Sequence, residues 1–283
     1  MSRTIRTAVI ALCIIAGIAA SAAPLLAWKP EQPGDYIPNS DYISMITRKR
    51  VSCEKIVGPR TMVMFTFGQS NSANSSPDKY TPKNPVYVFY EGKCYQGMDP
   101  LPGTSGSGGA VWTRLADKLI DAGMYEKVLI IAVGVGGTPM KRWTPGPDGD
   151  LYGRVLDAFD SLSKHNIKIT HMLWHQGEAD NGSRTPKDEY KRMYMAMVED
   201  IRKHGIDAPI YVAVATRCGR LGEGFEIQQA QRELVNPALN IYPGAYSDEL
   251  TSIDDRPDSC HFTGTGLDKH ATLWFNAIKY SGK

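Results

Sequence analysis

Two motifs, far apart in this 283-residue chain, contain residue types that could do chemistry. Ser70 belongs to the tetrapeptide Gly-Gln-Ser-Asn at 68–71, directly after the run 61–67. A short apolar, β-branched and aromatic run that ends in glycine predicts a buried strand followed by a turn. Open parallel sheets place their reactive groups at such carboxyl ends of strands. Ser70 is therefore a candidate nucleophile.

The second motif is Asp-Ser-Cys-His at 258–261, just before the last expected helix. The Asp-x-x-His spacing lets the carboxylate of Asp258 fold back onto Nδ1 of His261. Nε2 is then free to take a proton from a serine hydroxyl. Each motif alone is more often an ordinary turn or a helix cap. Together, in the order Ser, Asp, His, they predict a serine hydrolase.

A third segment, His-Gln-Gly-Glu-Ala-Asp, follows the apolar run 169–174. With it, the chain resembles the SGNH hydrolases, whose family carries four separated sequence blocks. Residues 68–71 are similar to block one, 107–109 to block two, 175–178 to block three and 258–261 to block five.

The residues in these blocks are similar to those of one branch of the SGNH hydrolases. Gly-Gln-Ser-Asn combined with His-Gln-Gly-Glu-x-Asp resembles the sialate O-acetylesterase-like branch and carbohydrate esterase family six. The resemblance covers residues 62–280. It implies an ester hydrolase and says much less about which sugar is the substrate.

The resemblance also implies roles for individual residues. Ser70 would attack, His261 would move the proton and Asp258 would orient His261. The oxyanion of the tetrahedral intermediate needs preorganised donors. We expect these to be the backbone N–H of Ser70, the side-chain amide of Gln176 and the N–H of Gly109. Gly109 ends a glycine-rich loop that opens into a helix, and its neighbour Gly108 is the second choice.

Five further residues are expected to orient the site or to contact substrate, namely Gln69, Asn71, His175, Glu178 and Trp143. Trp143 belongs to a glycine-threonine-tryptophan segment of the resembled family, and it would either stack on a sugar face or cover a loop. The preceding glycines at 134–137 lack the lysine and serine of a phosphate-binding loop, so we interpret them as a turn that lines the cleft. The histidines show no tight ligand spacing. We expect neither a metal ion nor a cofactor.

Strands and helices alternate along the chain, which predicts a parallel sheet covered on both faces. The expected strands lie near 61–67, 128–133, 169–175 and 210–215, with 86–90 as an edge strand or hairpin. The expected helices lie near 111–122, 153–164, 186–203, 224–235 and 265–280. The fold class is a three-layer α/β/α sandwich with a central, mainly parallel five-stranded sheet, the flavodoxin-like SGNH fold.

The N-terminus predicts export. Two arginines precede an apolar, small-residue stretch at 8–28, so residues 1–27 are expected to be a signal peptide or an N-terminal anchor. A lead-in segment is expected at 28–60 and the esterase domain at 61–283. The expected location is secreted or periplasmic, or membrane-anchored and facing outward. The formal net charge of +2 gives no indication of nucleic-acid binding.

Apart from Cys13 in the leader, four cysteines remain, and an even number in an exported chain favours disulfides. Three pairings are open, as are buried free thiols. We prefer Cys53–Cys94 and Cys218–Cys260, because the latter two should lie at strand ends that converge on the catalytic edge.

These observations predict an exported esterase that removes acetyl or other short acyl groups from carbohydrate hydroxyls. One alternative is a short-chain lipid esterase or an acyltransferase with the same machinery. Another is a non-catalytic glycan-binding protein that keeps the fold. The expected partner is an acetylated carbohydrate, with a membrane tether if the leader stays attached.

Overall fold

The computed structural model describes residues 48–282. The expected signal peptide or anchor at 1–27 lies outside the described residues, as does most of the expected lead-in segment. Among the described residues, no helix is long and apolar enough to cross a membrane.

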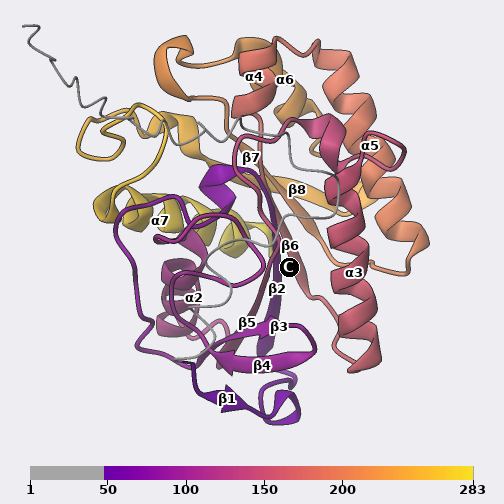
Figure 1. Cartoon of the computed structure of the whole chain (residues 1–283), viewed down its shortest axis with the longest axis vertical. Coiled ribbons are helices and arrows are strands. Elements are labelled where there is room, and N and C mark those ends of the chain that lie inside the picture. Colours follow the sequence, from indigo (N-terminus) through magenta and orange to yellow (C-terminus); the bar gives the residue numbers. More distant parts are fainter. Residues whose placement is uncertain (1–47, 283) are drawn as a thin grey trace, which may run out of the picture. The chain divides into compact units, whose positions relative to one another are not determined.

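One sheet of eight strands organises the described part of the chain, in the order β1-β4-β3-β5-β2-β6-β7-β8 (Figure 1). The strands are β1 (Arg50–Val51), β2 (Thr61–Gly68), β3 (Val86–Tyr90), β4 (Lys93–Gln96), β5 (Lys127–Ala132), β6 (His171–His175), β7 (Ile210–Val214) and β8 (Ile241–Tyr246). Neighbouring strands from β3 to β8 in this order are parallel, whereas β4 is antiparallel to both β3 and β1. The three-layer, mainly parallel architecture is as expected, but the expected number of five strands is wrong.

Two local features explain the additional strands. The turn between β3 and β4 has two residues, Glu91 and Gly92, both with positive φ. Such a turn suits the twist of a hairpin, so the edge extends by antiparallel pairing. Strand β8 was not expected from the sequence because it contains Pro243 and Gly244. It lies at the other edge of the sheet. Proline lacks an N–H, and an edge strand tolerates this because no further strand pairs with its outer side.

Strand β2 lies inside the sheet and all its residues are buried. Its side chains alternate between two apolar clusters, with Met62 and Met64 on one face and Phe65 and Phe67 on the other. A strand covered on both faces reads as a continuous apolar run rather than as an alternating one. This is why the run 61–67 could be recognised as a buried strand.

Helices cover both faces of the sheet. Their bounds are α2 (Val111–Asp121), α3 (Asp150–Lys164), α4 (Glu178–Ser183), α5 (Lys187–Lys203), α6 (Phe225–Glu233) and α7 (Gly264–Ser281). Leu115 of α2 and Trp274 of α7 belong to one cluster, whereas Val155 of α3, Tyr194 of α5 and Ile227 of α6 belong to the other. Figure 1 shows α2 and α7 on one side of the sheet and α3, α5 and α6 on the other. The five expected helices are all present.

The strand order places the site. After β2 the chain forms β3, β4 and β5 on one side of β2, and then β6 on its other side. In open parallel sheets, ligands bind outside the carboxyl ends of the strands at such a reversal. The segments that follow β2, β5 and β6 therefore meet at one edge of the sheet.

Two disulfides, Cys53–Cys94 and Cys218–Cys260, are present, and these are the pairings preferred from the sequence. The first joins the segment after β1 to the hairpin strand β4. Residues 50–51 of the expected lead-in segment are therefore part of the sheet edge, and Cys53 is bonded to it. Two disulfides are typical of proteins that work outside the cytosol, in the periplasm or the extracellular space.

Candidate active site

An open cleft of about 630 Å³ lies at the carboxyl ends of the parallel strands. Its lining residues include Gln69, Ser70, Gly136, Gly137, Glu178, Cys218 and His261. They follow strands β2, β5, β6 and β7 or precede helix α7. The cleft thus brings together the two motifs that the sequence predicts to react.

The turn after β2 presents Ser70. Gly68 has a φ of +126°, and a Cβ at this position would lie 2.0 Å from the carbonyl oxygen of His175. Glycine is therefore required where β2 passes closest to the end of β6. Ser70 opens the 3-10 turn Ser70–Ser72, and no acceptor among residues 48–282 takes its N–H. This N–H is free to donate to a bound substrate.

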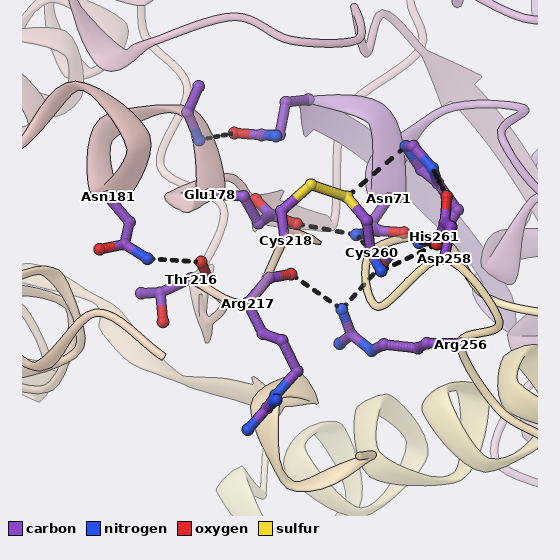
Figure 2. Close-up of a disulfide and its surroundings, with 12 residues drawn as sticks. Asn71, Glu178, Asn181, Thr216, Arg217, Cys218, Arg256, Asp258, Cys260 and His261 are labelled. Carbon is purple, nitrogen blue, oxygen red and sulfur yellow. Dashed lines mark hydrogen bonds and ion pairs between the residues drawn. A yellow bond between two sulfur atoms is a disulfide. The ribbon is translucent and has the colours of Figure 1, made fainter. Parts of the chain in front are cut away.

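Asp258 and His261 form a tight pair, seen beside the Cys218–Cys260 disulfide in Figure 2. The Nδ1 atom of His261 lies 2.7 Å from Oδ2 of Asp258. The other carboxylate oxygen accepts the backbone N–H groups of Cys260 and His261, at 2.8 and 2.7 Å. Ser259 adopts a φ of +61°, which closes this turn. Burial alone would raise the pKa of Asp258, but the hydrogen bonds from His261 and Cys260 outweigh it and lower this pKa.

Ser70 and His261 line the same cleft, but no hydrogen bond joins them in the described structure. The Nε2 atom of His261 lies 3.8 Å from Sγ of Cys260. Catalytic hydrogen bonds are often long in an empty enzyme and tighten only when substrate binds. Any mechanism that uses this pair therefore requires Ser70 and His261 to approach each other when substrate binds.

Asn71 ties the serine turn to the histidine loop (Figure 2). Its side-chain amide donates to Oε1 of Glu178 at 2.8 Å and to the carbonyl oxygen of Cys260 at 3.2 Å. Because Asn71 follows Ser70 directly and Cys260 precedes His261 directly, these bonds help to set the separation of Ser70 and His261.

Arg256 supports the same carbonyl from the other side (Figure 2). Its guanidinium donates to the carbonyl oxygens of Cys260 at 2.9 Å, Arg217 at 3.1 Å and Ser247 at 2.8 Å. It also lies over the ring of Phe262, 3.9 Å from the ring centre. Since Arg217 precedes Cys218, the buried side chain of Arg256 holds both of the segments that the disulfide joins. The sequence contained no local signal for this role, because the three carbonyls come from separate segments.

His175 and Glu178 are both buried, and Glu178 lines the cleft. Burial lowers the pKa of His175 to about 3, with a further contribution from Arg256, so its ring is neutral. Its Nε2 atom lies 3.1 Å from Oγ of Ser247. Burial raises the pKa of Glu178, whose Oε1 accepts from Asn71. Both residues hold the loops that carry the site.

Gln176 does not reach the cleft, in contrast to the expectation that it holds the oxyanion. Its side chain is fully buried, and Nε2 donates to the carbonyl oxygen of Thr138 at 3.1 Å and to the carboxylate of Asp180. An amide nitrogen carries two hydrogens. Both are therefore used within the protein, and Gln176 acts as a strut between the loops after β5 and β6.

Gly109 is not at the cleft either. Its N–H donates to the carbonyl oxygen of Ser76 at 2.7 Å, and the N–H of Gly108 donates to that of Asn74 at 3.0 Å. A Cβ on Gly109 would lie 2.1 Å from the carbonyl oxygen of Asp78. The glycines of this loop are thus needed for close packing against residues 74–78, and their N–H groups are not available to an oxyanion.

The loop after β5, rather than Gly109, lines the cleft. Gly136 and Gly137 line the cleft, and a Cβ on Gly136 would lie 3.5 Å from Cβ of Ser70. The N–H of Gly136 donates to Oγ of Ser105 at 2.8 Å, whereas that of Gly137 has no acceptor within the described range. Gly137 has a φ of +70°, which glycine adopts readily. Strand order could have indicated that this loop lies beside Ser70, since β5 is the neighbour of β2.

Trp143 cannot stack on a sugar in this structure, because its side chain is fully buried. Its Nε1 donates to Oγ1 of Thr138 at 2.9 Å, and its ring packs edge-on against Trp174 at 5.7 Å. Of the two roles left open for Trp143, the structure favours covering the loop.

A three-layer α/β/α sandwich with this cleft at the carboxyl ends of its parallel strands is the fold of the SGNH hydrolases. Residues 66–277 match the family described as "Carbohydrate esterase, sialic acid-specific acetylesterase", so the chain belongs to that family. It is a carboxylic ester hydrolase.

Solved structures share the fold at low sequence identity. A protein from Arabidopsis thaliana has a TM-score of 0.64 at 17% identity, covering 79% of this chain and 99% of its own. NanS has a TM-score of 0.55 at 15% identity, covering 80% and 99%. A carbohydrate acetylesterase from Xanthomonas citri has a TM-score of 0.54 at 16% identity, covering 78% and 57%. No curated protein sequence matches this chain.

Reduction of Cys218–Cys260 is expected to lower esterase activity before the protein unfolds. Cys218 lines the cleft and Cys260 adjoins His261, so opening the bond should loosen the histidine loop. Positioning errors of about 1 Å can cost on the order of 10² in rate. Activity, far-ultraviolet circular dichroism and thiol alkylation should be followed together during reduction.

A Cys53→Ser/Cys94→Ser double variant provides the control, because this bond lies at the hairpin edge of the sheet. The variant should remain active and keep the same sensitivity to reductant. Full activity after alkylation of both Cys218 and Cys260 would show that the bond does not position His261.

Proposed function

We propose that this protein removes acetyl groups from carbohydrate hydroxyls through a Ser70, His261 and Asp258 triad and an acyl-enzyme. The family match supports acetyl ester hydrolysis on a carbohydrate. The observation that carries the triad is the 2.7 Å pair of His261 Nδ1 and Asp258 Oδ2 in the cleft that Ser70 also lines.

In the proposed first half-reaction, Oγ of Ser70 attacks the carbonyl carbon of the acetyl ester. Nε2 of His261 takes the hydroxyl proton, while Asp258 holds Nδ1–H and stabilises the imidazolium. The negative charge develops on the carbonyl oxygen, where the unpaired N–H groups of Ser70 and Gly137 can receive it. The sugar hydroxyl then leaves with the proton from His261, and Ser70 carries the acetyl group.

In the second half-reaction, water attacks the acetyl carbon and gives its proton to His261. The tetrahedral intermediate is held by the same donors. Acetic acid leaves as His261 returns the proton to Oγ of Ser70, which restores the enzyme, and the acid ionises to acetate in water. Every step uses groups of this chain, substrate and water.

The location forms part of the proposal. The two disulfides and the predicted leader at 1–27 support export, with the domain at 61–283 acting in the periplasm or outside the cell. Retention by an uncleaved leader would tether the enzyme to the membrane, facing the same compartment.

We expect the enzyme to prefer acetyl over longer acyl esters. The glycine loop after β5 approaches Ser70 closely, so added methylenes must find room beyond it. A methylene misfit changes specificity by about 10-fold or more. Hence kcat/KM should fall by at least about 10-fold from 4-nitrophenyl acetate to the hexanoate.

The same assay distinguishes the alternatives. A preference for longer chains would indicate a lipid esterase, and transfer of acetyl to added sugar in place of water would indicate an acyltransferase. A complete lack of turnover would indicate a glycan-binding protein. Acetate release from a panel of acetylated polysaccharides and O-acetylated sialic acids would then identify the carbohydrate.

A further inference from the structure

Gln69, the residue before Ser70, has its side-chain oxygen fixed by neighbouring donors. Oε1 accepts the backbone N–H of Ala179 at 3.0 Å and that of Gly177 at 3.4 Å. It also lies 3.4 Å from Nε2 of Gln176. The residue is 2% exposed. Because two backbone N–H groups converge on this oxygen, the orientation of the amide is determined.

A flipped amide would turn its NH₂ group towards the N–H groups of Gly177 and Ala179, with no acceptor between them. Nε2 of Gln69 must therefore occupy the other side of the amide. Gln69 lines the cleft together with Ser70, and within residues 48–282 no acceptor takes the Nε2 hydrogens. A nearly buried NH₂ group without an acceptor is unfavourable unless a ligand or water supplies one.

Gln69 lines the cleft, whereas Gln176 does not and is fully buried. Nε2 of Gln176 lies 3.4 Å from the oxygen of Gln69, and its two hydrogens are used by Thr138 and Asp180. The backbone N–H of Gln69 donates to the carbonyl oxygen of His175 at 3.0 Å, which anchors it between β2 and β6. Of the two amides, that of Gln69 belongs to a residue that lines the cleft with Ser70.

We propose that Nε2 of Gln69 is the third oxyanion donor, completing a set with the N–H groups of Ser70 and Gly137. This inference rests on the proposed acyl-enzyme mechanism. The amide hydrogens of Gln176 are used by Thr138 and Asp180, so Gln176 does not contact the reacting atoms. Glutamine suits position 69 because its side chain has both groups that this position requires. Its oxygen accepts two backbone N–H groups, and its NH₂ group donates into the cleft.

Two substitutions at this position distinguish a donor from a support. Gln69→Glu keeps an oxygen for Gly177 and Ala179 but replaces the donor by a negative charge beside the oxyanion. Gln69→Ala removes both functions. A donor role predicts that kcat falls on the order of 10² to 10³ in Gln69→Glu, with KM little changed, and that Gln69→Ala is no worse. A purely supporting role predicts the reverse order, with Gln69→Glu near wild type.

Gln176→Met is the matched control, since it removes the hydrogen bonds to Thr138 and Asp180. It should lower the melting temperature while keeping kcat within about 10-fold, well short of an oxyanion-donor deletion. The Gln69 proposal is wrong if Gln69→Glu retains wild-type kcat, if Gln69→Ala changes only KM, or if Gln176→Met alone loses the full 10².

The rate at which 4-nitrophenyl acetate acetylates Ser70, followed by intact mass, separates this inference from the function on which it depends. If wild-type Ser70 is never acetylated, the acyl-enzyme mechanism itself fails, and the oxyanion role fails with it. If wild-type Ser70 is acetylated and Gln69→Glu reacts equally fast, only the role of Gln69 fails.

Discussion

Ser70→Ala is expected to lower kcat/KM for 4-nitrophenyl acetate by at least about 10⁴-fold, because the acyl-enzyme requires its Oγ. The fold should be retained, since this hydroxyl makes no hydrogen bond to the rest of the described chain. Residual hydrolysis would come from the remaining oxyanion donors alone. Steady-state kinetics, circular dichroism and the melting temperature together check both expectations.

Ser107→Ala is a suitable control for the nucleophile. Ser107 resembles part of a family block in the sequence, but it is exposed and lies outside the cleft. Its loss should change kcat/KM by less than about twofold, the ordinary range for surface positions. Hydrolysis by Ser70→Ala at the rate of Ser107→Ala would overturn the proposed mechanism.

Asp258→Asn is expected to lower kcat by about 10³ to 10⁴-fold with a small change in KM. The Asp258 carboxylate accepts from Nδ1 of His261, which leaves Nε2 as the free base. An asparagine amide can donate to Nδ1 instead, and the proton then resides on Nε2, where it prevents Ser70 from being deprotonated. The turn should survive, because an amide oxygen can still accept the N–H groups of Cys260 and His261.

Asp254→Asn is the matched control for charge. Asp254 is exposed and lies a few residues earlier in the chain, so the substitution removes the same charge without touching His261. Its kcat should stay close to that of the wild type. An equal loss in both variants would mean that charge near the cleft matters, rather than the tautomer of His261.

The elements with strong local patterns could be predicted from the sequence. The run 61–67 is apolar throughout because β2 is covered on both faces, and the helices 111–122 and 186–203 repeat their apolar positions along one face. The Asp258 and His261 pair could also be predicted, since the two residues are three positions apart on one turn. In such cases, the interacting residues are near neighbours in the chain.

Strand number could not be predicted in the same way. The short β1 and β4 have no distinctive pattern and exist because β3 offers an edge through a two-residue turn. Strand β8 contains a proline and a glycine that are tolerated only because it is at an edge. These strands form because a neighbouring strand pairs with them. A local window of sequence does not show which strand that neighbour will be.

The sequence by itself predicted the family, the parallel core, the pairing of Asp258 with His261 and Ser70 as the candidate nucleophile. The tertiary structure decided which donors face the cleft. Gly109 and Gln176 have suitable chemistry, but their N–H groups are taken by Ser76 and Thr138, which are distant in the chain, and by Asp180, four residues after Gln176. Gly137 and Gln69 remain available because β5 and β6 flank β2. A hydrogen-bond donor has few protons to give, so its function depends on every acceptor that folding places around it.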